Sequence, residues 1–360
     1  MTDETTAKLI LEDGTVFSGT SFGFEGSVAG EVVFNTSMTG YPESLTDPSY
    51  AGQILVATYP LIGNYGVPEA VLSDGLPDYF ESDRIQITAL IVSDYSEEYS
   101  HWSAKLSLGD WLIEYKIPGL YGIDTRELTK IIREKGAMMG KIVFGNSDPG
   151  FHDPNLDNLV AGVSTDKVIT YGKGSTRILL VDCGVKYNII RHFLKRDTTV
   201  IRVPWDYDYS GEKYDGLFIS NGPGDPKMCR ATINHLADSL KQDIPIFGIC
   251  LGNQLLALAS GADTYKLKYG HRSHNQPVLQ CGTNKAFVTS QNHGFAIDTD
   301  SLSGDWEPFF INLNDGTNEG IRHKTRPVFS VQFHPEASSG PTDSEYLFDE
   351  FLAIVNKPKY

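Results

Sequence analysis

Residues 245–254 read Pro-Ile-Phe-Gly-Ile-Cys-Leu-Gly-Asn-Gln, an apolar strand followed at once by the start of a helix. Within it, Gly248-Ile-Cys250-Leu-Gly252 has the spacing of a nucleophile elbow, a sharp strand-to-helix turn that needs glycines because side chains there would meet neighbouring backbone. The turn places Cys250 at a helix N-terminus, where unpaired N–H groups and the helix dipole favour a thiolate. A cysteine is more often a small buried residue, but this context favours a nucleophile.

The sequence around the elbow alternates apolar strands with helical spacing. Residues 177–182 form an apolar strand, 186–195 have helical spacing, and 198–203 form another strand, which together predict a βαβ unit. The other expected elements are strands 216–220, 245–249 and 327–333 and helices at 230–241 and 251–259. An α/β fold with a mostly parallel sheet flanked by helices is therefore predicted for 177–360.

A nucleophilic cysteine needs a base, and the base needs an orienting group. The stretch Phe333-His334-Pro335-Glu336 supplies both, directly after the strand at 327–333. Carboxyl ends of parallel strands form the active-site edge of such sheets, so His334 is expected beside Cys250. His-Pro-Glu alone is a weak signal and fits a capped loop, but together with the elbow it predicts a Cys250, His334 and Glu336 triad.

A glycine-rich stretch, Asn221-Gly-Pro-Gly-Asp-Pro226, follows the strand ending at Ser220. Two glycines at a strand end allow main-chain N–H groups to face a ligand. One interpretation is half of an oxyanion hole, with the Gly224 and Leu251 N–H groups as donors. The other is an ordinary turn, and the stretch by itself favours neither.

The first half predicts a β-rich α/β domain. Apolar runs flank Asp13-Gly14, a strong hairpin signal, and further strands are expected at 31–34, 53–57, 85–92 and 141–144. One helix is clear, with Asp124 as its N-cap, Glu127 three residues later and Gly136 after its end. We predict domains at 1–150 and 177–360, joined by a turn-rich linker at 151–176.

Composition narrows the function classes. The 360 residues carry 30 Lys plus Arg against 46 Asp plus Glu, a formal charge of −16 that disfavours binding to nucleic acid or anionic lipid. No apolar run reaches about 18 residues, so no membrane span is expected. Residues 1–7 do not resemble a signal peptide, and four cysteines do not make a disulfide scaffold, so a cytoplasmic protein with free thiols is expected.

Three other features of the sequence do not predict an additional site. Gly136-Ala-Met-Met-Gly140-Lys-Ile142 has three residues between its glycines where a phosphate loop has four, so no nucleotide cofactor is expected on this chain. His271-Arg-Ser-His274 has two metal-ligating side chains without an accompanying carboxylate cluster, which favours a polar loop and no metal. His293 is an alternative base, but His334 has the better companion and His293 is expected to be structural or near the substrate.

Taken together, Gly-Ile-Cys-Leu-Gly-x-Gln, Asn-Gly-Pro-Gly-Asp-Pro and His-Pro-Glu resemble the class I (triad-type) glutamine amidotransferases over about 177–354. The first half resembles the small-subunit family of the carbamoyl-phosphate synthetases, through residues 30–41, Leu45-Thr-Asp-Pro-Ser-Tyr50, residues 59–64 and Gly122-Ile-Asp-Thr-Arg126. Position 253 is Asn, where the family pattern often has His.

The resemblance implies that Cys250 attacks glutamine, that His334 transfers protons and that Glu336 orients His334. It implies ammonia transfer to a large synthetase subunit that carries ATP and Mg, in a heterodimer or higher oligomer that serves arginine or pyrimidine synthesis. It also implies that the glutamine is surrounded by Ser49, Lys186, Gly222, Gly224, Leu251, Gln254, Asn292, Gly294 and Phe295.

Two other functions remain open at this point. A stand-alone γ-glutamyl hydrolase of the same fold would leave the first half unexplained. A non-catalytic regulatory subunit would have no use for Cys250, His334 and Glu336 together.

Overall fold

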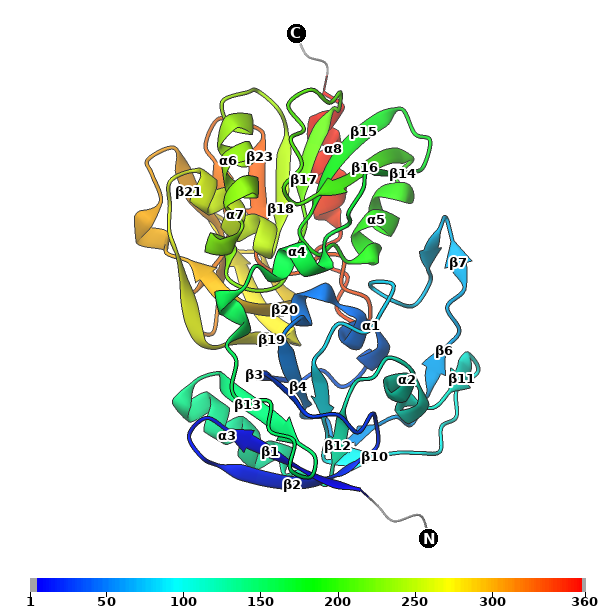
Figure 1. Cartoon of the computed structure of the whole chain (residues 1–360). Helices are drawn as coiled ribbons and strands as arrows, with labels where there is room; N and C mark the ends of the chain where they lie inside the picture. The colour runs from blue at the N-terminus through cyan, green and yellow to red at the C-terminus, as the bar shows by residue number, and fades with distance from the viewer. Residues whose placement is uncertain (1–4, 358–360) are drawn as a thin grey trace. The chain divides into compact units, whose positions relative to one another are not determined.

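The computed structural model describes residues 5–357 and divides into two compact units, Met1–Asp157 and Asn158–Tyr360 (Figure 1). The division falls inside the stretch predicted as a linker. That stretch itself contains η2 (Pro154–Leu156), α4 (Leu159–Val163) and β14 (Ile169–Tyr171).

Unit 1 is built around seven strands in the order β1-β13-β3-β4-β9-β12-β2, which close because β2 also pairs with β1. These strands are β1 (Thr6–Leu11), β2 (Val16–Ser21), β3 (Val28–Asn35), β4 (Gln53–Ala57), β9 (Ala89–Ile91), β12 (Gly119–Tyr121) and β13 (Met138–Val143). The predicted hairpin is confirmed, since β1 and β2 are antiparallel and Asp13 Oδ1 accepts from the Thr15 N–H in the turn. The strand predicted at 85–92 is much shorter than expected, because only Ala89–Ile91 pairs with neighbouring strands.

The helices of unit 1 are α1 (Tyr41–Thr46), η1 (Pro48–Tyr50), α2 (Leu108–Glu114) and α3 (Thr125–Lys135). The prediction of α3 is confirmed: Asp124 Oδ1 accepts from the Glu127 N–H at 2.8 Å, and Gly136 has a φ of 108°. The sequence did not predict α1 or α2, which are too short to show a helical period. Two-stranded sheets complete the unit, formed by β5 (Leu61–Ile62), β6 (Val67–Pro68), β7 (Leu72–Ser73), β8 (Leu76–Pro77), β10 (Asp94–Tyr95) and β11 (Ala104–Leu106).

Unit 2 contains one sheet of ten strands in the order β14-β16-β15-β17-β18-β23-β22-β21-β19-β20. Its parallel part consists of β15 (Thr176–Asp182), β16 (Thr198–Pro204), β17 (Gly216–Ile219), β18 (Ile246–Ile249) and β23 (Val328–Val331). These are the strands that the apolar runs predicted, and the α/β fold class is confirmed.

The rest of the sheet is antiparallel and was not predicted. It comprises β14, β19 (Thr264–Gln280), β20 (Ala286–Ile297), β21 (Trp306–Asn312) and β22 (Asn318–His323). β19 and β20 are long and carry many polar residues, and their register shifts twice, so they lack the clean alternation that reveals a half-buried strand.

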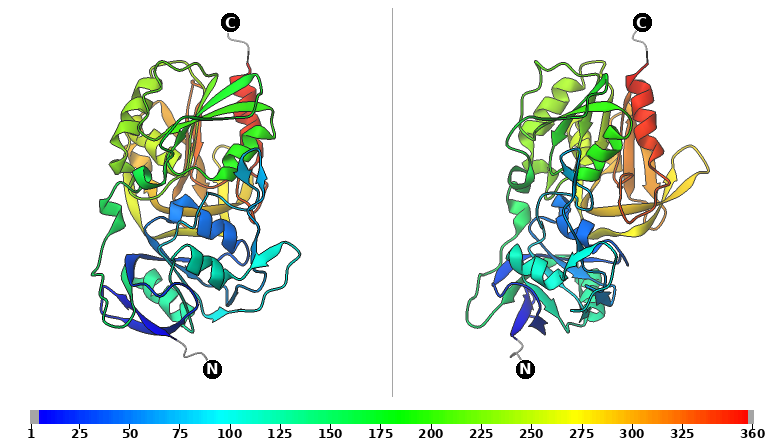
Figure 2. Two further views of the ribbon diagram at one scale, coloured as in Figure 1. Left: turned by 45° about the vertical axis from the view of Figure 1, so that its right-hand side comes forward. Right: turned by 90° about the vertical axis from the view of Figure 1, so that its right-hand side faces the viewer.

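Helices cover both faces of this sheet, as the right-hand view of Figure 2 shows for α6 and α8. One apolar layer joins the strand residues Leu179 and Leu217 to Leu236 of α6 and Leu255 of α7. On the other face, aromatic rings of α5 and α8 meet Phe218 and Phe247 of the strands. The helices of unit 2 are α4, α5 (Tyr187–Leu194), η3 (Pro226–Met228), α6 (Arg230–Ser239), α7 (Leu251–Ala259), η4 (Thr299–Ser301) and α8 (Tyr346–Val355).

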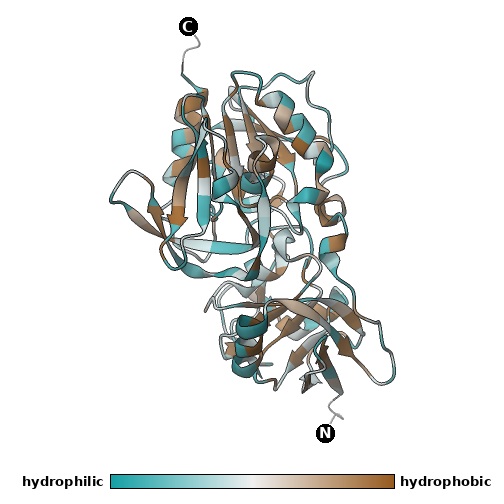
Figure 3. Ribbon diagram, turned by 90° about the vertical axis from the view of Figure 1, so that its left-hand side faces the viewer, coloured by the Kyte–Doolittle hydropathy of each residue, from teal (hydrophilic) through white to brown (hydrophobic). Residues whose placement is uncertain are grey.

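Figure 3 shows the corresponding hydropathy: the central strands are largely brown, and the helices carry both brown and teal. This pattern is that of a sheet buried between two amphipathic layers. None of the helices formed by residues 5–357 combines the length and the apolar character that crossing a bilayer requires.

Candidate active site

The predicted elbow is present at the end of β18. A Cβ on Gly248 would lie 2.7 Å from the Gly252 carbonyl oxygen, and one on Gly252 would overlap the Ile219 carbonyl oxygen of the next strand. Only glycine allows this approach of helix to sheet. Cys250 lies between them as the N-cap of α7, with φ 56° and ψ −104°, a conformation that a side-chain-bearing residue rarely adopts. Such strain is typical of functional positions.

Hydrogen bonds hold Cys250 from both sides. Its N–H donates to the Val331 carbonyl at 2.8 Å, which fixes the elbow to the end of β23, the strand that leads to His334. Its thiol contacts the Asn292 carbonyl of β20 at 3.7 Å. Cys250 is 2% exposed, so the nucleophile is held in a buried position with a fixed direction.

His334 and Glu336 follow the end of β23 and contact each other. His334 Nδ1 lies 2.7 Å from Glu336 Oε1, and both side chains are buried. A ring nitrogen facing a carboxylate carries the proton, so the contact sets the tautomer and leaves Nε2 for proton transfer. Among residues 5–357, Nε2 has no hydrogen-bond partner.

Lys186 completes this group. Its Nζ lies 2.9 Å from Glu336 Oε1, the same oxygen that faces His334. Asn188 donates to the main-chain carbonyl of Glu336. The resemblance placed Lys186 near the glutamine, but its ion pair with Glu336 had no signal in the sequence because 150 residues separate the two.

The charges shift one another's titration. Burial opposes ionisation of Glu336, but Lys186 and His334 outweigh it and hold the pKa of that carboxyl well below its usual range. Burial lowers the pKa of His334, whereas the Glu336 carboxylate and the charge of Cys250 raise it, with the net result well above the ordinary value, at about 10. The histidine is therefore held as a cation that can give a proton to a leaving group.

The predicted oxyanion-hole segment follows β17. Asn221 Oδ1 accepts from the Lys186 N–H at 3.0 Å, which ties this segment to the loop that precedes α5. Gly222 approaches the Cys183 carbonyl and the Leu251 side chain, and Gly224 has a φ of 81°. The assignment of the Gly224 and Leu251 N–H groups as oxyanion donors stays a prediction.

A buried amide cluster lies behind the elbow. Gln254 Nε2 donates to the Phe295 carbonyl at 2.9 Å and to Gln332 Oε1 at 3.2 Å. Asn253 Nδ2 donates to the same Gln332 oxygen at 3.0 Å, and Asn253 Oδ1 accepts from the Ser330 hydroxyl at 2.8 Å. The sequence did not predict a role for Gln332, although this residue lies two residues before His334. Its single oxygen orients both Asn253 and the expected glutamine-binding residue Gln254.

The remaining expected substrate residues fall in two places. Asn292, Gly294 and Phe295 follow one another on β20, and Asn292 and Phe295 are linked to the elbow by the contacts given above. Ser49 lies in η1 of unit 1, where its N–H donates to Asp47 Oδ1. The glutamine contacts of all these residues stay predictions.

Three histidines outside the triad lie on β19 and β20. The prediction of a polar loop at His271–His274 is wrong, because both residues lie within β19. The lack of an accompanying carboxylate was also misleading, since β22 brings Glu319 to His271. His293 is buried, its Nδ1 donates to the Phe295 carbonyl at 2.8 Å, and burial holds its pKa well below the ordinary value. It is a neutral residue of the strand beside Cys250, in keeping with a structural role.

The fold and the grouping of Cys250, His334 and Glu336 define the class as a triad-type cysteine enzyme with its nucleophile on a strand–helix elbow. Comparison with known families agrees: residues 179–354 match "Glutamine amidotransferase class-I", and residues 9–142 match "Carbamoyl-phosphate synthase small chain, CPSase domain". The chain therefore belongs to the carbamoyl-phosphate synthase small-chain family, with a class I glutamine amidotransferase domain as its second half.

Some relatives match nearly the whole of this chain and are identical to it at about half of the positions. The chain is 52% identical over 359 residues to the Mus musculus protein named carbamoyl-phosphate synthase (ammonia), mitochondrial, covering 98% of this chain and 24% of that one. It is 53% identical over 360 residues to multifunctional protein CAD of Squalus acanthias, covering 98% and 16%. The chain thus spans about a quarter or less of the length of these relatives. A crystal structure of a glutamine amidotransferase from Thermotoga maritima is similar with a TM-score of 0.40 and 21% identity, over 46% of this chain and 78% of that one.

Proposed function

We propose that this chain is the glutamine-hydrolysing part of a carbamoyl-phosphate synthase. The observation that carries the proposal is the shared Glu336 oxygen, which holds His334 and Lys186 at the edge of the sheet that bears Cys250. A non-catalytic subunit gains nothing from a buried three-residue charge cluster, since buried ion pairs are costly to maintain.

The chemistry follows from the placement of these groups. The Cys250 thiolate attacks the side-chain amide carbon of glutamine, and the oxygen that becomes anionic is held by the main-chain N–H groups of Gly224 and Leu251. His334 protonates the departing nitrogen, so that ammonia leaves and a thioester remains on Cys250. His334 then takes a proton from water, which attacks the thioester and releases glutamate. The thioester bond breaks in this last step and returns Cys250 to the thiolate, so that one glutamine and one water are consumed and one glutamate and one ammonia are formed.

A stand-alone γ-glutamyl hydrolase is disfavoured by unit 1, since residues 9–142 match the small-chain domain of carbamoyl-phosphate synthase. We propose that unit 1 serves in docking and contributes Ser49 to the glutamine site. We further propose that ammonia passes to the large carbamoyl-phosphate synthetase subunit in a heterodimer or higher oligomer, and that this subunit holds ATP and Mg. The product then serves arginine or pyrimidine synthesis, and the location is cytoplasmic.

The names of several relatives specify ammonia, which raises a second candidate: a chain that serves an ammonia-using synthase without hydrolysing glutamine. The intact Cys250, His334 and Glu336 group favours glutamine. The two candidates separate when carbamoyl phosphate synthesis by the complete enzyme is measured with glutamine and with ammonia as nitrogen source. Activity with ammonia alone would favour the second.

The direct test of the glutaminase is release of glutamate from glutamine by the complete enzyme. We expect Cys250→Ala to abolish it while ammonia-dependent synthesis continues, because the synthetase chemistry does not need the thiol. The matched control is Cys281→Ala, which removes a cysteine that is neither in the elbow nor fully buried. Wild-type glutamate release by Cys250→Ala would show that the nucleophile is assigned wrongly.

Docking to the synthetase has its own test. The acidic excess of this chain suggests that part of its surface faces a basic patch on the partner. Copurification of the tagged chain from its native cytosol should bring the synthetase along, and rising salt should weaken the association. Assembly that does not respond to salt would contradict the electrostatic part of the proposal.

A further inference from the structure

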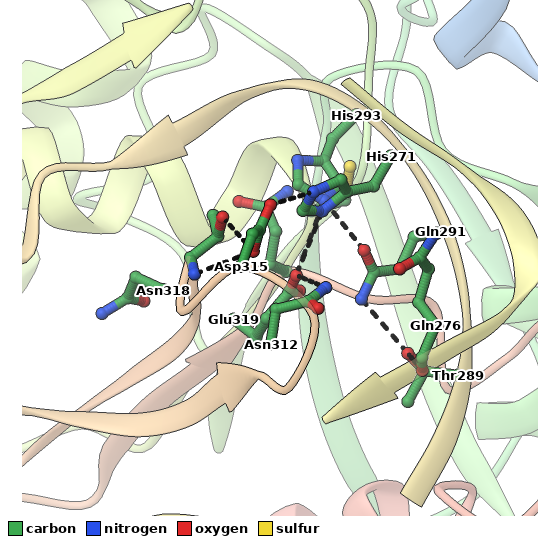
Figure 4. A network of polar contacts seen from close by, with 12 residues as sticks. His271, Gln276, Thr289, Gln291, His293, Asn312, Asp315, Asn318 and Glu319 are labelled. Carbon is green, nitrogen blue, oxygen red and sulfur yellow. Dashed lines mark hydrogen bonds and ion pairs between the residues drawn. The ribbon is translucent and has the colours of Figure 1, made fainter. Parts of the chain in front are cut away.

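A second group of chemistry-bearing side chains lies in unit 2, in the antiparallel part of the sheet. His271 on β19, His293 on β20 and Glu319 on β22 are all buried, and their ligating atoms lie within 4.8 Å of one another. Figure 4 shows the three side chains converging from their strands, with Asp315 and Gln291 beside them. The triad chemistry proposed above does not use any of the three.

Two atoms of this group are unsatisfied. Within the described residues, His271 Nδ1 and Glu319 Oε2 are buried and have no hydrogen-bond partner. His271 Nδ1 lies 3.3 Å from Glu319 Oε1, close but without hydrogen-bond geometry, and His293 Nε2 lies 3.9 Å from the same oxygen. A fully buried carboxylate with an unpaired oxygen is costly unless something positive compensates it.

Each imidazole ring has a polar partner on the nitrogen that faces away from Glu319. His271 Nε2 lies 2.9 Å from Asp315 Oδ2, and His293 Nδ1 donates to the Phe295 carbonyl at 2.8 Å. These contacts turn His271 Nδ1 and His293 Nε2 toward Glu319. A carboxylate or carbonyl on the outer nitrogen is the support that metal-ligating histidines usually have.

We propose that His271, His293 and Glu319 bind a divalent transition-metal ion, with Zn²⁺ the best match. Two imidazoles and one carboxylate are a common zinc ligand set. Ligand atoms about 2.1 Å from a tetrahedral ion lie about 3.4 Å from one another, and the two separations from Glu319 Oε1 are 3.3 and 3.9 Å. With both imidazoles neutral, the carboxylates of Glu319 and Asp315 balance the double charge of the ion.

The ion has a structural role in this proposal. Gln291 Oε1 lies 3.2 Å from His293 Nε2 and offers a fourth ligand atom, which would close the coordination shell. The ion ties β19, β20 and β22 together. His293 follows Asn292, whose carbonyl contacts the Cys250 thiol, so the ion also steadies the strand beside the nucleophile.

The alternative without metal is a protonated His271 between Asp315 and Glu319, since burial lowers the pKa of His271 but the two carboxylates raise it. The experiment must distinguish a bound zinc ion from a protonated His271. It must also exclude zinc that is bound by Cys250 and His334. It therefore uses the full chain, untagged, carrying Cys250→Ala. The protein is stripped with a chelator, dialysed against Zn²⁺, and its metal content is measured by mass spectrometry.

We expect about one zinc per chain and a higher Tm with Zn²⁺ than with chelator, because an ion that binds the folded state stabilises it. Adding Glu319→Gln or His271→Ala should lose most of the zinc. The control is His152→Ala, which removes a histidine of an exposed pair with Asp157 and should retain the ion.

Two outcomes would overturn the proposal: no zinc bound and no rise in Tm in the parent protein, or zinc retained equally in Glu319→Gln and His271→Ala. If these variants do not fold, zinc-edge X-ray absorption of the parent protein decides. Two imidazole ligands in the first shell support the site, and a shell without them refutes it.

Discussion

Lys186 Nζ and Glu336 Oε1 lie 2.9 Å apart, although the two residues come from opposite ends of unit 2. The lysine precedes α5 and the glutamate follows β23. Because His334 faces the same oxygen, Glu336 is the centre of a buried charge cluster and not merely the third member of a triad.

Removing the Lys186 side chain leaves the buried carboxylate of Glu336 with one partner fewer. We expect Lys186→Met to lower the free energy of unfolding by about 3–5 kcal/mol, the usual effect of breaking a buried ion pair. Chemical denaturation measures it. The control is Lys227→Met, which breaks an exposed pair with Asp263 and should cost less than about 1 kcal/mol. Equal effects from the two variants would contradict the importance of burial.

Neutralising Glu336 should change the pH profile as well as the rate. We expect Glu336→Gln to reduce kcat for glutamine hydrolysis by about 10²–10⁴-fold, since the histidine loses its orienting charge. The carboxylate raises the pKa of His334, and the proton donor is lost as pH rises through that pKa. The alkaline decline of activity should therefore move to lower pH in the variant. An unchanged alkaline limb would mean that another group controls it.

The tight elbow should not accept a side chain. Gly252→Ala places a methyl group against the Ile219 carbonyl, so we expect a loss of about 1–3 kcal/mol in unfolding free energy and a much slower glutaminase. Gly211→Ala is the control, because nothing lies within 4 Å of its added carbon. If Gly252→Ala is as stable and active as Gly211→Ala, the helix does not need this close approach.

His192 should make the chain less stable in mild acid. Burial lowers its pKa from 6.5 to about 4, so between these values the unfolded chain binds a proton that the folded chain does not. Stability from this group is complete above pH 6.5 and falls as pH drops toward 4, by about 3 kcal/mol. His192→Phe keeps a ring against Phe348 without titrating. Unfolding curves at several pH values should show a shallower loss in the variant, and parallel curves would reject the assignment.

Much of the site could be predicted because its motifs are local. The elbow requires glycines two residues on either side of the nucleophile, and His334 and Glu336 are two residues apart, so short-range geometry determines both. The parallel strands were visible because strands buried on both faces read as continuous apolar runs. The strands β19 and β20 could not be predicted, because their exposed and polar residues and their register shifts obscure the alternation of buried and exposed side chains.

The sequence by itself determined the α/β class, the nucleophile, its base and the orienting acid, because each depends on the backbone within a few residues. Only the tertiary structure decided which distant groups share a site. Lys186 reaches Glu336, Gln332 orients Gln254, and Glu319 meets His271 and His293, each between elements that are far apart in the chain and that the fold of unit 2 brings together. The spacing of residues in the sequence does not reveal the order of the strands in a sheet, and this order determines which of these side chains meet.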